Sequence, residues 1–169
     1  GKDDERLVTL RLEEAERATT PEEQARLLIE VAESCEERLD RSDQAAELYQ
    51  RAIKLGHGID VSTRALVRIF SKEGMWNALA GALRSAVDRA SEPATKARLL
   101  VRGAQIHGEK LKNQDVAAEL LEEALEHCPG DRAILEQLER VSVGRRDWAR
   151  AAEVGERLVD LEALEIGRA

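Results

Sequence analysis

Three basic side chains stand out among the residues that could carry chemistry: Arg64, Arg68 and Lys72. They are spaced four apart, so on a helix they would share one face and form a single basic stripe. An arginine guanidinium is planar and can pair a carboxylate through two hydrogen bonds, which suits such a stripe to binding acidic side chains. The same charges could instead neutralise neighbouring glutamates or be solvated, because exposed charge rows usually contribute little energy.

The stripe lies in a basic part of an acidic chain, whose formal net charge is −8. Residues 1–58 hold 15 acidic and 9 basic side chains, and residues 113–169 hold 14 acidic and 7 basic. Between them, residues 59–112 hold 5 acidic and 10 basic side chains. This charge asymmetry indicates an acidic partner rather than nucleic acid, because the chain as a whole would repel a phosphate backbone.

The sequence contains no pattern expected of an enzyme. His57, His107 and His127 share no spacing with acidic or cysteine ligands, and no glycine-rich phosphate loop, GxSxG or HExxH occurs. We therefore expect no enzyme activity, no catalytic, metal-ligating or cofactor-binding residue, and no cofactor. Cys35 and Cys128 are too few and too far apart for a disulfide framework, so two reduced thiols in a cytoplasmic protein are expected.

The composition predicts a helical protein with a substantial core. The chain has 169 residues, of which 43% are hydrophobic and only 2% are aromatic. Alanine, leucine, glutamate and arginine, all good helix formers, dominate, and no two-residue alternation indicates a strand. No apolar run approaches the length of a membrane span, so a membrane is not an expected partner. Single-stranded nucleic acid is not expected either, because too few aromatic residues are present to stack on its bases.

A 72-residue internal repeat sets the organisation of the chain. DQAAELYQRAI at 43–53 returns as DVAAELLEEAL at 115–125, and ARLL at 25–28 returns at 97–100. Fixed periods of this kind are typical of stacked helical units, in which no unit can bury its apolar face alone. We expect the chain to begin within an array and to be one segment, 1–169, of a longer repeat protein.

Each repeat is expected to contain four helices in two antiparallel hairpins. Thr20 is a good N-cap and Pro21 suits the first helical position, so the first helix should begin there. The expected helices of the first repeat are 21–39, 43–55, a third that is capped by Asp60 and ends at about residue 72, and 75–90. The expected divisions of the chain are a terminal helix at 1–19, hairpins at 20–58, 59–91, 92–130 and 131–162, and a tail at 163–169.

The hairpins resemble tetratricopeptide repeats (TPRs). That family places a small residue in the first helix of a hairpin and two alanines around a large residue in the second, followed by proline. The matching positions are Ala32, Ala45, Tyr49, Ala52 and, in place of proline, His57; then Ala104, Ala117, Leu121, Ala124 and Pro129. The spacing continues at 34 residues, and the resemblance covers about residues 20–162. The second and fourth hairpins match less well, since Val67 and Glu139 replace the small residue.

The resemblance implies a right-handed α-solenoid of about nine helices that acts as a protein–protein interaction scaffold or adaptor. In TPR proteins the first helix of each hairpin lines a concave groove, so an acidic peptide or surface could bind there. The candidate partner-binding residues are Arg64, Arg68, Lys72, Arg98, Arg102 and Arg140.

Two other functions stay open from the sequence. One is a structural spacer or self-assembly module that forms homo-oligomers through its ends, where Leu7 and Leu10 lie. The other is the regulatory arm of an enzyme whose catalytic domain lies outside this chain. Trp76 and Trp148, equivalent under the 72-residue shift, are expected to fill the core, with an exposed anchor for a partner as the alternative.

Overall fold

The computed structural model describes residues 1–168, which contain nine α-helices, one π-helical turn and no strand. The chain divides into two compact units: unit 1 is Gly1–Ala90, and unit 2 begins at Ser91. Unit 1 consists of α1 (Lys2–Arg17), α2 (Pro21–Leu39), α3 (Ser42–Lys54), α4 (Ile59–Glu73) and α5 (Trp76–Arg89). Unit 2 consists of α6 (Pro93–Gln105), the π-helical turn η1 (Ile106–Lys110), α7 (Gln114–His127), α8 (Arg132–Gly144) and α9 (Trp148–Gly167).

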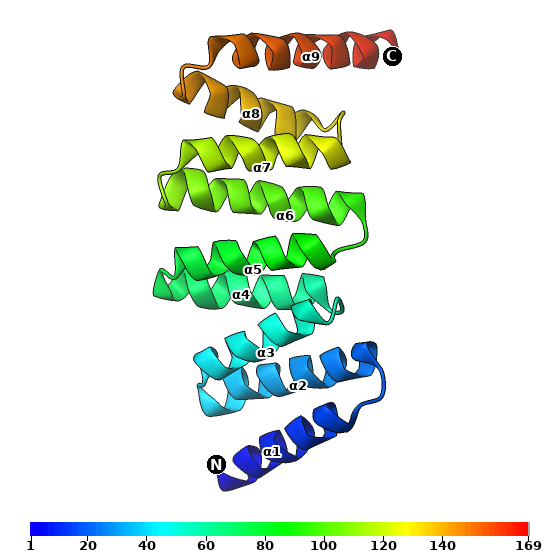
Figure 1. Ribbon diagram of the computed structural model, residues 1–169, viewed down its shortest axis with the longest axis vertical. Coiled ribbons are helices and arrows are strands. Elements are labelled where there is room, and N and C mark those ends of the chain that lie inside the picture. The colour runs from blue at the N-terminus through cyan, green and yellow to red at the C-terminus, as the bar shows by residue number, and fades with distance from the viewer. Residues whose placement is uncertain (169) are drawn as a thin grey trace. The chain divides into compact units, whose positions relative to one another are not determined.

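Within each unit, helices that follow one another in the chain pack side by side and run in opposite directions (Figure 1). In unit 1, α1 packs on α2, α2 on α3, α3 on α4 and α4 on α5, while in unit 2, α6 packs on α7, α7 on α8 and α8 on α9. Each unit is therefore an all-α stack of antiparallel helix hairpins, as the sequence predicted. The stack places the first helices of consecutive hairpins, α2 with α4 and α6 with α8, one helix apart.

Two local residues, Thr20 and Pro21, fix the start of α2. The Thr20 hydroxyl accepts a hydrogen bond from the backbone N–H of Glu23 at 3.2 Å, and Pro21 occupies the first turn.

The four helices predicted for the first repeat are all present, with ends within two residues of those expected. The expectation that Asp60 caps the third helix was wrong, because α4 begins at Ile59 after the N-cap Gly58. Gly58 precedes α4 with a φ of 63°, and a Cβ there would overlap Cδ1 of Ile29. Its backbone conformation therefore favours glycine, and any larger residue would have to displace the end of the Ile29 side chain.

The alanines that recur with the repeat lie where helices pack closely. All six are buried, as expected of small side chains at positions where hairpin helices pack on one another. They are Ala32, Ala45, Ala52, Ala104, Ala117 and Ala124. Larger side chains fill the rest of the core. Leu66 on α4 and Leu138 on α8, which are also equivalent under the 72-residue shift, are fully buried.

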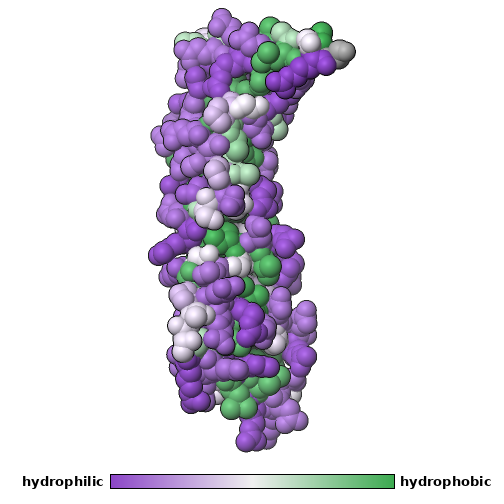
Figure 2. Space-filling view, turned by 90° about the vertical axis from the view of Figure 1, so that its right-hand side faces the viewer, coloured by the Kyte–Doolittle hydropathy of each residue, from purple (hydrophilic) through white to green (hydrophobic). Residues whose placement is uncertain are grey.

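The two tryptophans differ, although the repeat makes them equivalent. Trp76 is half-buried, whereas Trp148 is 63% exposed, so the prediction that Trp148 fills the core was wrong. The reason lies in the helix that carries it. In α5 five residues are buried, but in α9 only Val154 is, because little of unit 2 covers that helix. Apolar side chains on α9 are accordingly visible at the top of Figure 2.

Candidate functional site

A hollow of about 400 Å³ lies in unit 1 between the first helices of two consecutive hairpins, α2 and α4, above α3. We call it the α2–α4 hollow. Its lining comes from all three helices and is rich in charge: Glu33, Glu36, Glu37, Tyr49, Val61, Arg64, Ala65 and Arg68. Two of the arginines predicted to bind a partner, Arg64 and Arg68, therefore lie in one depression of the surface. This is the type of position that the TPR resemblance implied for a binding site.

Within the α2–α4 hollow, Arg68 is already paired with a carboxylate of its own chain. Its Nη2 lies 2.7 Å from both carboxylate oxygens of Glu36, and the Tyr49 hydroxyl donates to Glu36 Oε2 at 3.0 Å. The hydrogen bond to Glu36 raises the pKa of Arg68, so the guanidinium stays charged. Burial, and then the hydrogen bond to Glu36, raise the pKa of Tyr49, so the phenol stays protonated. Arg68 thus neutralises a neighbouring glutamate, which is one of the two roles the sequence left open.

The other members of the predicted stripe are placed differently. Arg64 is exposed, and its Nε donates to the backbone carbonyl of Asp60 at 3.2 Å. Lys72 is exposed on the same helix but lines a separate depression, with Glu73 and with residues of the α2–α3 turn such as Asp40. The stripe is therefore present on α4, yet only Arg64 and Arg68 share the α2–α4 hollow.

A second hollow lies at the equivalent place in unit 2, between α6 and α8 and above α7. We call it the α6–α8 hollow. Its volume is about 550 Å³. It is lined by Ala104, Gln105, Gly108, Glu109, Gln114, Ala117, Leu121, Gln137, Arg140, Val141 and Gly144. Under the 72-residue shift, Arg140 falls on Arg68, Gly108 on Glu36 and Leu121 on Tyr49. The two hollows therefore keep the arginine but differ at both of its partners.

Arg140 has no hydrogen-bond or ion-pair partner among residues 1–168, because the carboxylate that would face it is absent. Gly108 belongs to η1, where the backbone N–H of Leu111 bonds to the carbonyl of Ile106, five residues back. The equivalent part of unit 1 is continuous α-helix up to Leu39. Isolated π-helical turns are frequent at functional sites. The alignment of the two repeats already showed that Gly108 replaces Glu36. Only the contact between Glu36 and Arg68 shows that this replacement removes the partner of an arginine.

The remaining predicted arginines lie outside the α6–α8 hollow. Arg98 and Arg102 are both exposed on α6, and Arg102 Nη1 donates to Gln105 Oε1 at 3.3 Å. Of the three unit 2 candidates, only Arg140 lines the hollow. Sequence reasoning missed Gly108, Gln105 and Gln137 as residues of this site, because none of them carries a charge.

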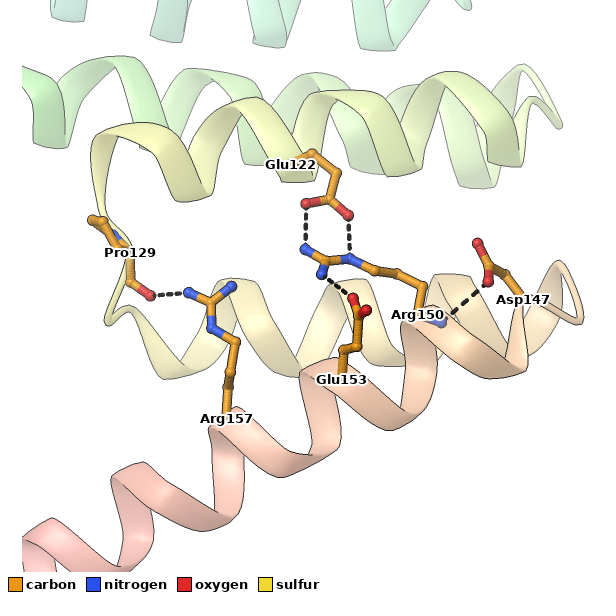
Figure 3. A network of polar contacts seen from close by, with 6 residues as sticks. All are labelled: Glu122, Pro129, Asp147, Arg150, Glu153 and Arg157. Carbon is orange, nitrogen blue, oxygen red and sulfur yellow. Dashed lines mark hydrogen bonds and ion pairs between the residues drawn. The ribbon is translucent and has the colours of Figure 1, made fainter.

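A second polar network in unit 2 is structural (Figure 3). Arg150 of α9 donates from Nε and Nη2 to the two carboxylate oxygens of Glu122 on α7, each at 2.6 Å, and from Nη1 to Glu153 at 2.7 Å. The bonds to Glu122 raise the pKa of Arg150. Arg157 Nη2 donates to the backbone carbonyl of Pro129 at 2.7 Å. These contacts attach α9 to the preceding helices of unit 2, where Val154 is its only buried residue.

Residues 1–168 contain no cluster of three or more histidine, cysteine, aspartate or glutamate side chains arranged to hold a metal ion. None of the helices in this part of the chain combines the length and the apolar composition that a membrane-spanning helix needs. Cys35 is buried and Cys128 half-buried, and neither forms a disulfide. Burial raises the pKa of the Cys35 thiol, which disfavours the reactive thiolate.

Two solved structures resemble the chain over most of its length. A crystal structure of MamA matches with a TM-score of 0.59 and 13% identity, covering 85% of this chain and 81% of MamA. A structure described as "MamA RS-1 ArsTM double mutant" matches with a TM-score of 0.56 and 17% identity, covering 96% of this chain and 97% of that one. No protein-family model and no curated protein matches the sequence. At these identities the likeness concerns the fold, and the chain shares the TPR-like, all-helical fold of the MamA structures.

Proposed function

We propose that this chain is a protein-interaction scaffold that binds an acidic segment of a partner protein at the hollows between the first helices of its hairpins. The observation that carries the proposal is the recurrence of one feature. Each unit has a hollow at the same place, and each hollow is lined by an arginine that pairs with no carboxylate among residues 1–168: Arg64 in the α2–α4 hollow and Arg140 in the α6–α8 hollow. Guanidinium groups in partly enclosed depressions are suited to pairing carboxylates.

The stacked-hairpin fold supports the same proposal. Helical repeats present extended surface on rigid elements, which suits them to holding a peptide or a protein surface. Further positive charge lies on two of the first helices of the hairpins. The exposed basic residues outside the two hollows are Lys72 on α4, and Arg98 and Arg102 on α6. They would attract an acidic segment over a longer range than the arginines in the hollows.

Photo-crosslinking tests this proposal. The photoreactive residue p-benzoylphenylalanine is placed at Val61 or at Gln137, one in each hollow, and the protein is irradiated in host lysate. Matched controls carry the same residue at Asn77 of α5 or Ala149 of α9, which are exposed and equivalent under the 72-residue shift. We expect a partner to crosslink several-fold more from the hollow positions than from the controls, and through an acidic segment identified by mass spectrometry. Equal yields from all four positions, or attachment through neutral or basic segments, would refute the proposal.

Self-assembly is a second candidate function, because both terminal helices expose large apolar side chains. Leu7 and Leu10 on α1 are 41% and 55% exposed, and Val159 and Ile166 on α9 are also exposed. Apolar side chains that gather on one helix favour association with another surface. Such contacts between copies of the chain would extend the array or join its ends.

If self-assembly occurs, the molar mass from light scattering should rise with protein concentration. Changing Leu7 and Leu10 together to glutamine should then return the mass to that of a monomer, because the exposed apolar surface on α1 is lost. The paired control changes the exposed charged residues Glu13 and Glu14 of the same helix to glutamine and should leave association unchanged. A mass that stays at 18.8 kDa at every concentration would rule out this second function.

A further inference from the structure

We propose that the α6–α8 hollow receives a glutamate side chain of the partner protein, whose carboxylate pairs with Arg140 as Glu36 pairs with Arg68 in unit 1. The inference rests on the proposed function and specifies the chemistry of one of its sites. Its basis is an internal comparison. Unit 1 contains the complete pair, with Arg68 Nη2 2.7 Å from both Glu36 oxygens, and unit 2 keeps the arginine without its acid.

The space for the incoming side chain comes from two substitutions between the repeats. Gly108 stands where Glu36 stands and has no side chain, while Leu121 stands where Tyr49 stands and lacks a phenol. The α6–α8 hollow is correspondingly the larger of the two, at about 550 Å³ against about 400 Å³. The room created lies where a carboxylate of the chain itself sits in unit 1, so a side chain of glutamate length from another molecule fits the same place.

The α6–α8 hollow is lined by fewer negative charges than the α2–α4 hollow, which favours an acidic ligand. Three carboxylates line the α2–α4 hollow, whereas only Glu109 lines the α6–α8 hollow. Glu136, which takes the place of Arg64, is outside the lining and pairs with Arg132 at 2.9 Å. The hollow therefore offers an arginine with no partner among residues 1–168 and a lining with fewer repulsive charges.

Neutral donors complete the site. Gln137 lies one turn before Arg140 on α8, lines the same hollow and has no hydrogen-bond partner among the described residues. Its amide can donate to the second carboxylate oxygen, a role that the Tyr49 hydroxyl performs for Glu36 in unit 1. The apolar floor, which includes Ala117 and Leu121, suits the methylene groups of a glutamate side chain.

The test is an NMR titration of the ¹⁵N-labelled chain with a small acidic probe. The probe is an N-acetylated, C-terminally amidated pentapeptide of glycine and alanine with one central glutamate. Two control peptides are used. In the first, glutamine replaces the glutamate. The second has no acidic side chain but ends in a free C-terminal carboxylate. We expect the glutamate peptide to shift the Arg140 Nε–H and the Gly108 and Gln137 amide signals, with a dissociation constant of about 1 mM for one such contact.

Gly108→Glu is the decisive variant, because it restores the missing acid. A Cβ at Gly108 would lie 3.4 Å or more from its nearest neighbours, the Gln114 side-chain amide and Cβ of Ala117, which is ordinary van der Waals contact, so the variant should fold. Its own carboxylate should occupy Arg140 and weaken peptide binding about tenfold or more. Gly81→Glu adds the same charge at an exposed glycine of α5 with no atom near its Cβ, and should bind like the parent.

Two substitutions of the lining give opposite expectations. Arg140→Gln should weaken glutamate-peptide binding to the level of the glutamine peptide, and Glu109→Gln should strengthen it because a repulsive carboxylate is lost.

The inference is overturned if Gly108→Glu binds as the parent does, if the shifts map to Glu36 and Arg68 instead, or if no shift appears up to about 20 mM peptide. It is equally overturned if only the free C-terminal carboxylate binds. Crosslinking from Gln137 is independent of these results, so the inference can fail while the proposed function stands.

Discussion

Replacing Leu138 with alanine is expected to lower the free energy of unfolding of unit 2 by about 2–5 kcal/mol. Leu138 lies on α8 and is completely buried, as is its repeat equivalent Leu66 on α4. The substitution removes buried methyl and methylene groups and leaves a cavity that the packed helices can close only in part. Truncations of fully buried side chains of this kind are among the largest effects expected of single substitutions.

Urea denaturation followed by tryptophan fluorescence measures this effect in unit 2. Trp148 begins α9, which packs on α8, so a Trp76→Phe background leaves one reporter in the affected unit. The matched control is Leu164→Ala on α9, where the leucine is 58% exposed and the same truncation should change stability by less than about 0.5 kcal/mol. Equal destabilisation by both substitutions would mean that Leu138 is not part of a packed core.

Replacing Glu36 with alanine is expected to destabilise unit 1 by about 1–3 kcal/mol. The cost arises mainly at Tyr49, a buried residue whose hydroxyl would lose its acceptor at 3.0 Å. The pair with Arg68 contributes little, because the Arg68 side chain is 64% exposed and its charge is screened by water. Urea denaturation, followed by Trp76 fluorescence in a Trp148→Phe background, measures the loss.

A double-mutant cycle with Tyr49→Phe separates the two contributions. In the Tyr49→Phe background the Glu36→Ala change should cost clearly less, because no hydroxyl is then left without a partner. Glu36→Gln keeps an acceptor and should lie between the parent and Glu36→Ala. A full-sized cost of Glu36→Ala in the Tyr49→Phe background would assign the effect to Arg68 and contradict this account.

The same network predicts a pH dependence. Burial raises the pKa of Tyr49 above its ordinary value of 10.0, so folding favours the protonated phenol. The stability that this shift contributes is complete below pH 10 and is lost as the pH rises toward the pKa of the folded state. We therefore expect the free energy of unfolding to fall more steeply above pH 10 in the parent than in Tyr49→Phe, in urea titrations at a series of pH values. Parallel curves would exclude a raised pKa at Tyr49.

The helices and their pairing could be predicted from the sequence because the signals for them are local. The cap at Thr20, the proline at Pro21 and the repeated alanines act over one or two helical turns, and the 72-residue shift shows which hairpins are alike. The predicted helix ends of the first repeat were accordingly correct to within two residues. Trp148 shows the limit of this reasoning. Its sequence neighbours repeat those of Trp76, but its burial depends on what packs across α9.

The sequence by itself determined that this chain is an array of helix hairpins with basic residues on α4, on α6 and at Arg140. It could not determine which of those residues have partners. Arg68 meets Glu36 from a position 32 residues away, on a helix that only the stacking of hairpins brings near. The same stacking makes Gly108 the empty counterpart of Glu36 and leaves Arg140 facing a hollow. Helix formation follows from short-range periodicity, whereas ion pairing depends on contacts between helices, and so only the tertiary structure decided it.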